Sequence, residues 1–243
     1  HVSTRATPGR VALHDVSLHI NRGAIIGIAG VDGNGQAELA ELLLGLFPPT
    51  QGAIRLQGRT LHSPTPAQLR AAGVALIPHD RRHEGLALSL SIEENLLLNS
   101  HVLSMLTPGV HFSPRAMRRF AEQQMTRFSI RAASPDQPVA SLSGGNQQRV
   151  VIARELAQDP SLLIAANPSR GLDVGATTYV HQTLRAHAQR GAGVLLISTD
   201  LDEITALSAR VYVLYQGRLL GPVPSISDRS TIGQMMTGAQ TSC

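Results

Sequence analysis

The segment that most constrains the fold lies near the amino end of the chain. An apolar run at residues 24–29 leads into a glycine-rich loop at residues 30–35. In residues 36–47, which follow the loop, leucines recur at helical spacing. The order strand, glycine loop, helix is typical of an α/β protein that binds a phosphate group at the start of the helix.

The rest of the chain continues this alternation of apolar strands and helices. Further strands are predicted at residues 11–20, 53–57, 74–77, 162–166, 194–197 and 211–214, and helices near residues 144–158, 174–190 and 200–207. Residues 91–130 are rich in helix signals. We therefore expect an α/β fold with a mainly parallel sheet flanked by helices, an N-terminal antiparallel β part and a helical subdomain.

We expect a single domain over residues 1–243, with its core at about residues 1–85 and 160–221, a helical subdomain at about 90–158, and a tail at 222–243. Because the chain opens at His1 without a methionine, we expect it to be a fragment with a domain missing before it. The lone cysteine, Cys243, is consistent with a reducing compartment and favours the cytoplasm.

Composition excludes several other classes of protein. Apolar residues make up 42% of the chain and charged residues 16%, which is typical of a globular domain. The net charge is +4, but aromatic residues are only 3% and the basic ones are scattered, so we expect no nucleic-acid partner. All 21 basic side chains other than histidine are arginines. No apolar run approaches the roughly 20 residues of a membrane span, so membrane association would need a partner.

The glycine loop has the scaffold of a phosphate-binding loop but lacks its charged parts. Such a loop uses glycines to turn backbone N–H groups toward the anion, a lysine for the outer phosphates and a hydroxyl for Mg²⁺. Gly30, Gly33 and Gly35 stand at the glycine positions, whereas Gln36 and Ala37 replace the lysine and the hydroxyl. A plain glycine turn remains an alternative. A dinucleotide-binding loop is disfavoured, because a glutamate, Glu38, stands where a third glycine is needed.

The motif that carries a family resemblance lies at Leu142-Ser143-Gly144-Gly145-Asn146-Gln147-Gln148-Arg149. It resembles the LSGGQ signature of ATP-binding cassettes in the form found in sugar and nucleoside importers, and Ala153-Arg154-Glu155-Leu156 continues the match. The alternative is a helix capped by Ser143. The resemblance implies the ATP-binding-cassette fold of P-loop NTPases, and a signature that faces the nucleotide held by an opposite domain.

The resemblance also assigns roles to positions that carry unusual residues here. Ala166 and Asn167 stand where the family has an aspartate for Mg²⁺ and a glutamate for the attacking water. Thr199 takes the place of a histidine that senses the γ-phosphate. His79 stands where the family carries a glutamine, which implies a coupling role. The alternative is that His79 lies in a surface loop. Asp173 is a contact to the partner domain or a helix cap.

The resemblance therefore implies the second half of a tandem ATPase subunit of a sugar or nucleoside importer, degenerate at its own site and with little hydrolysis alone. ATP would bind weakly or at a shared interface, Mg²⁺ binding here is doubtful, and no other metal site is expected. The implied partners are a second, fused nucleotide-binding domain, transmembrane permease subunits and, indirectly, a substrate-binding protein, on the inner face of the cell membrane. Alternatives are a regulatory or structural nucleotide-sensing module and a soluble cassette protein of translation or repair.

The nucleotide-binding residues are expected to be Gly30, Val31, Asp32, Gly33, Asn34, Gly35, Gln36 and Ala37, and the signature residues Leu142, Ser143, Gly144, Gly145, Asn146 and Gln147.

Overall fold

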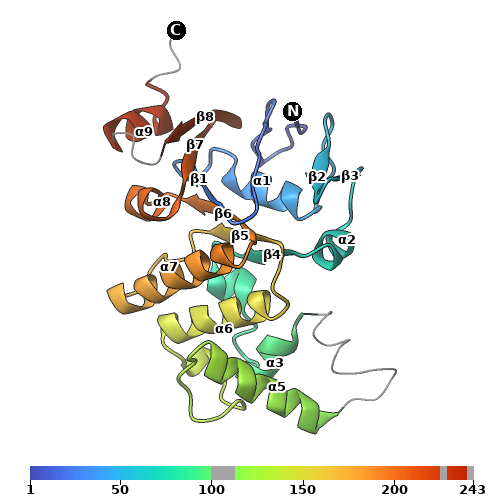
Figure 1. Ribbon diagram of the computed structural model, residues 1–243, viewed down its shortest axis with the longest axis vertical. Helices are drawn as coiled ribbons and strands as arrows, with labels where there is room; N and C mark the ends of the chain where they lie inside the picture. The colour runs from blue at the N-terminus through green and yellow to red at the C-terminus, as the bar shows by residue number, and fades with distance from the viewer. Residues whose placement is uncertain (100–112, 225–228, 240–243) are drawn as a thin grey trace. The chain divides into compact units, whose positions relative to one another are not determined.

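The computed structural model describes residues 1–99, 113–224 and 229–239. The chain forms two compact units, of which the first comprises His1–Leu76, Ser161–Asn167 and Thr183–Cys243 and the second Ile77–Pro160 and Pro168–Gln182. Figure 1 shows the order of the elements along the chain.

The centre of the first unit is a six-stranded sheet with the strand order β4-β5-β6-β1-β7-β8. Strand β1 pairs in parallel with both β6 and β7, β5 pairs in parallel with β6, and the edge strand β8 runs antiparallel to β7. The mainly parallel sheet is thereby confirmed, and so is a small antiparallel part formed by β2 and β3. The strands are β1 Ile25–Ala29, β2 Ile54–Leu56, β3 Arg59–Leu61, β4 Val74–Ile77, β5 Leu162–Ala166, β6 Gly193–Ser198, β7 Arg210–Tyr215 and β8 Arg218–Pro224.

Continuous apolar runs explain why these strands lie in the middle of the unit. Every residue of β1 and β6 is buried, as expected for parallel strands covered on both faces. Leu39 and Leu42 of α1 belong to the same buried cluster as Ile26 and Ile28 of β1. The helices of this unit are α1 Gln36–Leu43, α2 Pro66–Ala71, α8 Leu201–Leu207 and α9 Arg229–Met236, together with the end of α7 Val174–Gln189.

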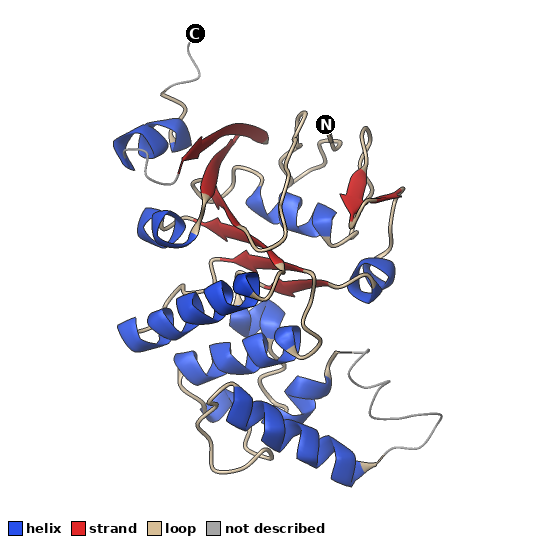
Figure 2. Cartoon of the chain, viewed as in Figure 1, coloured by secondary structure: helices blue, strands red, loops and turns tan. Residues whose placement is uncertain are grey.

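The second unit is helical. Figure 2 draws its described residues as helices and loops, apart from the last residue of β4. Serine side chains cap three of its helices, because Ser91, Ser113 and Ser143 each accept a hydrogen bond from a backbone N–H in the first turn. Its elements are η1 Arg81–Gly85, α3 Ile92–Leu97, α5 Pro114–Arg127, η2 Val139–Ser141, α6 Gly144–Leu156 and the start of α7. The helix signals of residues 91–130 are confirmed where the chain is described, and residues 100–112 lie outside that part.

Two expectations from the sequence were wrong. Residues 11–20 form no strand, because Asp15 turns the chain with φ 53° and Val16 only makes an isolated bridge to Val2. The helix expected at residues 36–47 ends at Leu43, just before the left-handed Gly45. The segment expected to be a tail, residues 222–243, includes the end of β8 and helix α9, whose Ile232, Met235 and Met236 are buried at helical spacing. No helix among the described residues has the length and apolar character needed to cross a membrane.

Candidate functional site

The glycine loop connects β1 to α1 and requires glycine at several positions. Gly33 and Gly35 have φ values of 87° and 111°, in the left-handed region that disfavours larger residues. Gly35 is the N-cap of α1 and makes no side-chain capping bond. A β carbon on Gly30 would lie 2.7 Å from the carbonyl oxygen of Leu214. The first N–H groups of α1 therefore stand at the end of a loop with the backbone shape that anion-binding loops use.

The side chain of Gln36 folds back into this loop. Its Nε2 donates a hydrogen bond to the carbonyl oxygen of Val31 at 2.8 Å, and its Oε1 accepts one from the backbone N–H of Asn34 at 3.0 Å. The carboxamide packs so closely against Gly30 that a β carbon there would collide with it. A neutral group of the protein itself thus engages one of the loop amides.

Asn34 fixes the loop to the turn between β7 and β8, a contact that was not predicted from the sequence. Its side-chain Oδ1 accepts a hydrogen bond from the backbone N–H of Gln216 at 2.9 Å, and its carbonyl accepts one from Gly217 at 2.9 Å. Its Nδ2 also donates to the carbonyl of Val31 at 2.9 Å. The dipeptide Gln216-Gly217, between two apolar strands, was the available signal for this turn.

The sheet brings the ends of β5 and β6 to the same edge as the loop. Strands β1 and β5 both pair in parallel with β6, so Gly30, Asn167 and Thr199 all follow the carboxyl ends of neighbouring strands. The Oδ1 of Asn167 accepts a hydrogen bond from the backbone N–H of Thr199 at 2.9 Å. The residues of the first unit that the sequence assigned to one site therefore share one edge.

The residues at this edge do not fit a magnesium site. Mg²⁺ takes oxygen ligands in nearly octahedral geometry. The two positions at which the family resemblance implies metal ligands, Ala37 and Ala166, carry methyl side chains without an oxygen. Within residues 1–99, 113–224 and 229–239, no group of three or more histidine, cysteine, aspartate or glutamate side chains is placed to hold a metal ion.

In the second unit, the signature residues form the start of helix α6. Ser143 is the N-cap, and its Oγ accepts hydrogen bonds from the backbone N–H and the Nδ2 of Asn146, at 3.4 and 3.1 Å. Gln147 is buried and donates to the carbonyl of Val139 at 3.2 Å. Gly144 and Gly145 are the first helical residues, so their N–H groups have no acceptor within the helix. Leu142 is buried directly before the cap.

The turn at residues 169–173 belongs to the same unit as the signature. Asp173 caps α7, because its Oδ1 accepts a hydrogen bond from the backbone N–H of Ala176 at 2.8 Å. Asp173 therefore acts as a helix cap, and its contact to a partner domain stays a prediction. The guanidinium of Arg170 is hydrogen-bonded to Nε2 of His79. This bond links the turn to the segment that follows β4.

Arg81, which no sequence motif singled out, lies beside the signature. Its Nη1 donates a hydrogen bond to the carbonyl oxygen of Arg170 at 2.8 Å. Burial lowers the pKa of its guanidinium, and the neighbouring charge of Arg82 lowers it further, whereas Asp80 raises it. The pair Arg81-Arg82 is visible in the sequence, but nothing in the pattern distinguishes the half-buried arginine from the exposed one.

A protein-family model described as "ABC transporter" matches residues 13–170, which include both the glycine loop and the signature. The chain belongs to the ABC transporter family. It is 38% identical over 239 residues to the guanosine import ATP-binding protein NupO of Bacillus subtilis (strain 168), covering 98% of this chain and 47% of that protein. It is 40% identical over 215 residues to the ribose import ATP-binding protein RbsA 2 of Rhizobium meliloti (strain 1021), covering 88% and 42%. This ABC transporter domain is thus related to the ATP-binding proteins of sugar and nucleoside importers, and spans about half the length of these relatives.

Solved structures confirm the ABC ATPase fold. A nucleotide-free ATP-binding cassette from an ABC transporter superposes with a TM-score of 0.78 at 19% identity, covering 95% of this chain and 94% of that one. A cassette dimer in a post-hydrolysis state, with ADP and Pi bound, superposes with a TM-score of 0.76 at 21% identity, covering 93% and 97%. At this level of identity the likeness concerns the fold alone.

Proposed function

We propose that this chain is the nucleotide-binding domain of an ABC importer for simple sugars or nucleosides, with a degenerate site of its own and a signature that completes the ATP site of a partner cassette. The observation that carries the proposal is the contrast between its two anion-binding elements. In one, the neutral side chain of Gln36 is hydrogen-bonded into the loop. In the other, the start of α6 at Gly144 and Gly145 has the composition of an intact signature behind the cap of Ser143.

Charge supports the idea that the glycine loop is not a catalytic site. Phosphoryl transfer depends on positioned groups that neutralise charge, and removing one such group commonly costs on the order of 10²–10³ in rate. Gln36, Ala37, Ala166 and Asn167 are neutral, and Thr199 replaces the expected histidine. Even with strong non-additivity, these changes leave too little electrostatic stabilisation for useful turnover. Nucleotide binding at residues 30–37 would rest on backbone N–H groups alone.

The start of α6 can serve a phosphate group that another protein domain holds. Its unpaired N–H groups carry the partial positive charge of a helix N-terminus, and glycines permit close approach of an anion. In the same unit, Asp173 shapes the turn that precedes α7. Val174, the residue after it, is 85% exposed, which suits a surface that a partner covers.

The length of the relatives supports a tandem arrangement. Because this chain covers 47% of NupO and 42% of RbsA 2, we propose that it is one of two fused cassettes. Its degenerate loop and intact signature favour the second of them. Within it, residues 1–85 and 160–221 would form the core, 90–158 the helical subdomain and 222–243 the tail. Permease subunits would hold the pair at the inner face of the membrane, and a substrate-binding protein would deliver the solute outside. His79 lies in the segment through which the permease would be coupled.

The proposed function can be tested by introducing a negative charge at the signature and measuring ATP hydrolysis. In the assembled transporter, Ser143→Asp keeps a good helix cap but puts a carboxylate where a phosphate group would approach. ATP hydrolysis should fall by about 100-fold or more. The matched variant Ser143→Asn, also a good cap but neutral, should lose much less activity. Equal rates for Ser143→Asp and the unmodified protein would refute the proposal and favour a structural module that only docks a partner.

A further inference from the structure

Three segments of the second unit meet at one guanidinium group. The Nη1 of Arg81, at the start of η1, donates to the carbonyl oxygen of Arg170 in the turn 169–173. Its Nη2 packs against the first residue of α6, since a β carbon on Gly144 would lie 2.8 Å from it. A β carbon on Gly171 would lie 4.0 Å from the same nitrogen. Arg81 thus touches the signature and the turn at once.

The backbone around Arg81 is fixed by hydrogen bonds within its turn. Asp80 is the N-cap of η1 and accepts hydrogen bonds from the backbone N–H groups of Arg82 at 2.8 Å and His83 at 3.1 Å. Gly85 lets this turn pack closely, because a β carbon there would lie 3.1 Å from the Cγ of Pro78 and 3.2 Å from the Cγ2 of Val151. The backbone from which Arg81 extends is therefore fixed by its own turn.

The position of the guanidinium is electrostatically unfavourable, which argues for a specific role. It stands at the N-terminus of α6, where the helix carries a partial positive charge. Its Nε is buried without a hydrogen-bond partner, and Arg81 makes no ion pair with the part of the chain that the structure describes. A solvent-exposed arginine would avoid both costs. The hydrogen bond to the Arg170 carbonyl compensates in part for these costs.

We propose that Arg81 is a positioning residue that holds the turn 169–173 against the start of α6, so that the surface offered to a partner's nucleotide is preformed. This inference rests on the proposed function. Arg81 acts through the Arg170 carbonyl and Gly144. Because the surface is held before the cassettes meet, it stays complementary to the reacting nucleotide without rearrangement.

The contact requires arginine in particular. A planar guanidinium presents one NH₂ group to the Arg170 carbonyl while the other packs against Gly144. Lysine carries the same charge as a single ammonium group on a flexible stem, so it can reach one of these neighbours and not both. The next residue, Arg82, is exposed and uses only its backbone N–H in this turn, which makes it a matched control.

The experiment compares Arg81→Ala, Arg81→Lys and Arg82→Ala in the assembled transporter, with turnover counted per nucleotide-occupied partner site. This normalisation removes the effect of protein that has failed to fold. For Arg81→Ala, kcat should fall about 10- to 100-fold, while KM for ATP changes less than about threefold because the partner's own loop binds the nucleotide. Arg81→Lys should restore only part of the loss, and Arg82→Ala should stay within about twofold of the unmodified protein.

Turnover of Arg81→Ala equal to that of Arg82→Ala would overturn the inference. So would full rescue by Arg81→Lys, because charge alone would then suffice. Ser143→Asp separates this failure from that of the proposed function. If Ser143→Asp abolishes hydrolysis while Arg81→Ala does not, the signature serves the partner and only the role of Arg81 is wrong. If neither variant changes hydrolysis, the proposed function itself fails.

Discussion

The side-chain oxygen of Asn167 accepts a hydrogen bond from the backbone N–H of Thr199 at 2.9 Å and so joins the loops that follow β5 and β6. Asn167 is held in the left-handed region, with φ 43°, and its own N–H donates to the carbonyl of Ile197 at 2.7 Å. Asparagine tolerates this backbone conformation better than most residues. At two positions where the family resemblance implies catalytic side chains, the chain thus has a contact that supports the sheet edge.

Removing this contact should destabilise the first unit. Asn167→Ala leaves the N–H of Thr199 without its acceptor and places alanine in a left-handed conformation. We expect the free energy of unfolding to fall by about 1–3 kcal/mol in urea denaturation. Asn167→Asp, which keeps both the acceptor oxygen and the backbone tolerance, is the control and should lose less. Identical losses for the two variants would mean that the hydrogen bond contributes nothing.

The Gln36 carboxamide should order the glycine loop in the absence of nucleotide. Gln36→Ala removes its bonds to Val31 and Asn34. Each is worth about 0.5–1.5 kcal/mol. The amide of Asn34 should then exchange its hydrogen faster, which NMR-detected hydrogen exchange measures. The amide of Leu195, in the buried strand β6, is the internal control and should keep its rate. Unchanged exchange at Asn34 would contradict this account of the loop.

Restoring the missing charge should restore nucleotide affinity at the loop. In the double variant Gln36→Lys and Ala37→Ser, the loop regains a cation and a hydroxyl. We expect ATP in the presence of Mg²⁺ to bind at least about 10-fold more tightly, roughly 1.4 kcal/mol, by calorimetry. Hydrolysis should not return, because Ala166 and Asn167 still lack carboxylates. Ala37→Ser alone should have little effect, since the hydroxyl adds no charge.

Local patterns were enough to predict most of the sheet and the signature helix. Apolar runs such as residues 162–166 and 194–197 are long enough to be recognised as buried strands. Ser143 before two glycines indicated a helix start, and α6 begins there. These features depend on neighbours in sequence, so a single chain reveals them.

Contacts between distant residues were not predictable in this way. The alternation in residues 11–20 suggested a strand, but the structure leaves Val16 with only an isolated bridge to Val2. The hydrogen bond from Arg81 to the Arg170 carbonyl joins residues 89 positions apart. The hydrogen bond from the backbone N–H of Gln216 to the side chain of Asn34 joins residues 182 positions apart. No periodicity in the sequence reports such pairings, because they depend on how distant segments of the chain pack together.

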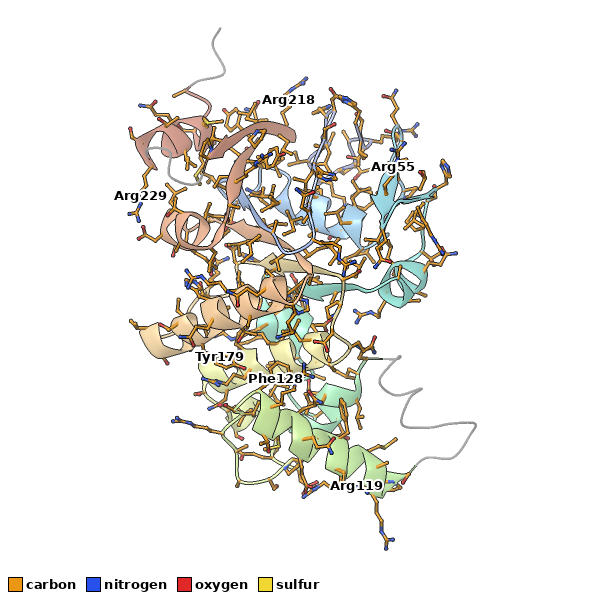
Figure 3. The ribbon with its side chains drawn as sticks, in the orientation of Figure 1. Arg55, Arg119, Phe128, Tyr179, Arg218 and Arg229 are labelled. Atoms are coloured by element: carbon orange, nitrogen blue, oxygen red, sulfur yellow. The ribbon has the colours of Figure 1, made fainter. Side chains whose placement is uncertain are left out.

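The ring of Tyr179 in α7 should stabilise the second unit through two separable interactions. Its hydroxyl donates to the carbonyl of Phe128 at 3.0 Å, and the guanidinium carbon of Arg149 lies 3.6 Å from its ring centroid. Figure 3 labels both Tyr179 and Phe128. Tyr179→Phe should cost about 0.5–1.5 kcal/mol of unfolding free energy.

Tyr179→Leu should cost about 0.5–2 kcal/mol more than Tyr179→Phe, because the cation–π contact is lost as well. Urea denaturation of both variants measures the difference. In an Arg149→Ala background the two variants should differ by less, since the cation is then absent. An undiminished difference in that background would show that packing of the ring, and not the cation, is responsible.

The carboxyl group of Asp80 should titrate at unusually low pH. Hydrogen bonds from the His83 side chain, and then from the backbone N–H groups of His83 and Arg82, lower its pKa from the ordinary 3.8 to about 2. Between these values the unfolded chain binds more protons than the folded one, so this contribution to stability is present above pH 3.8 and is lost as the pH falls through about 2.

NMR titration of the Asp80 carboxyl carbon measures the midpoint directly. His83→Ala should raise the midpoint but leave it below 3.8, because backbone N–H groups still donate. A midpoint at the ordinary value in the unmodified protein would contradict the cap that fixes the turn of Arg81.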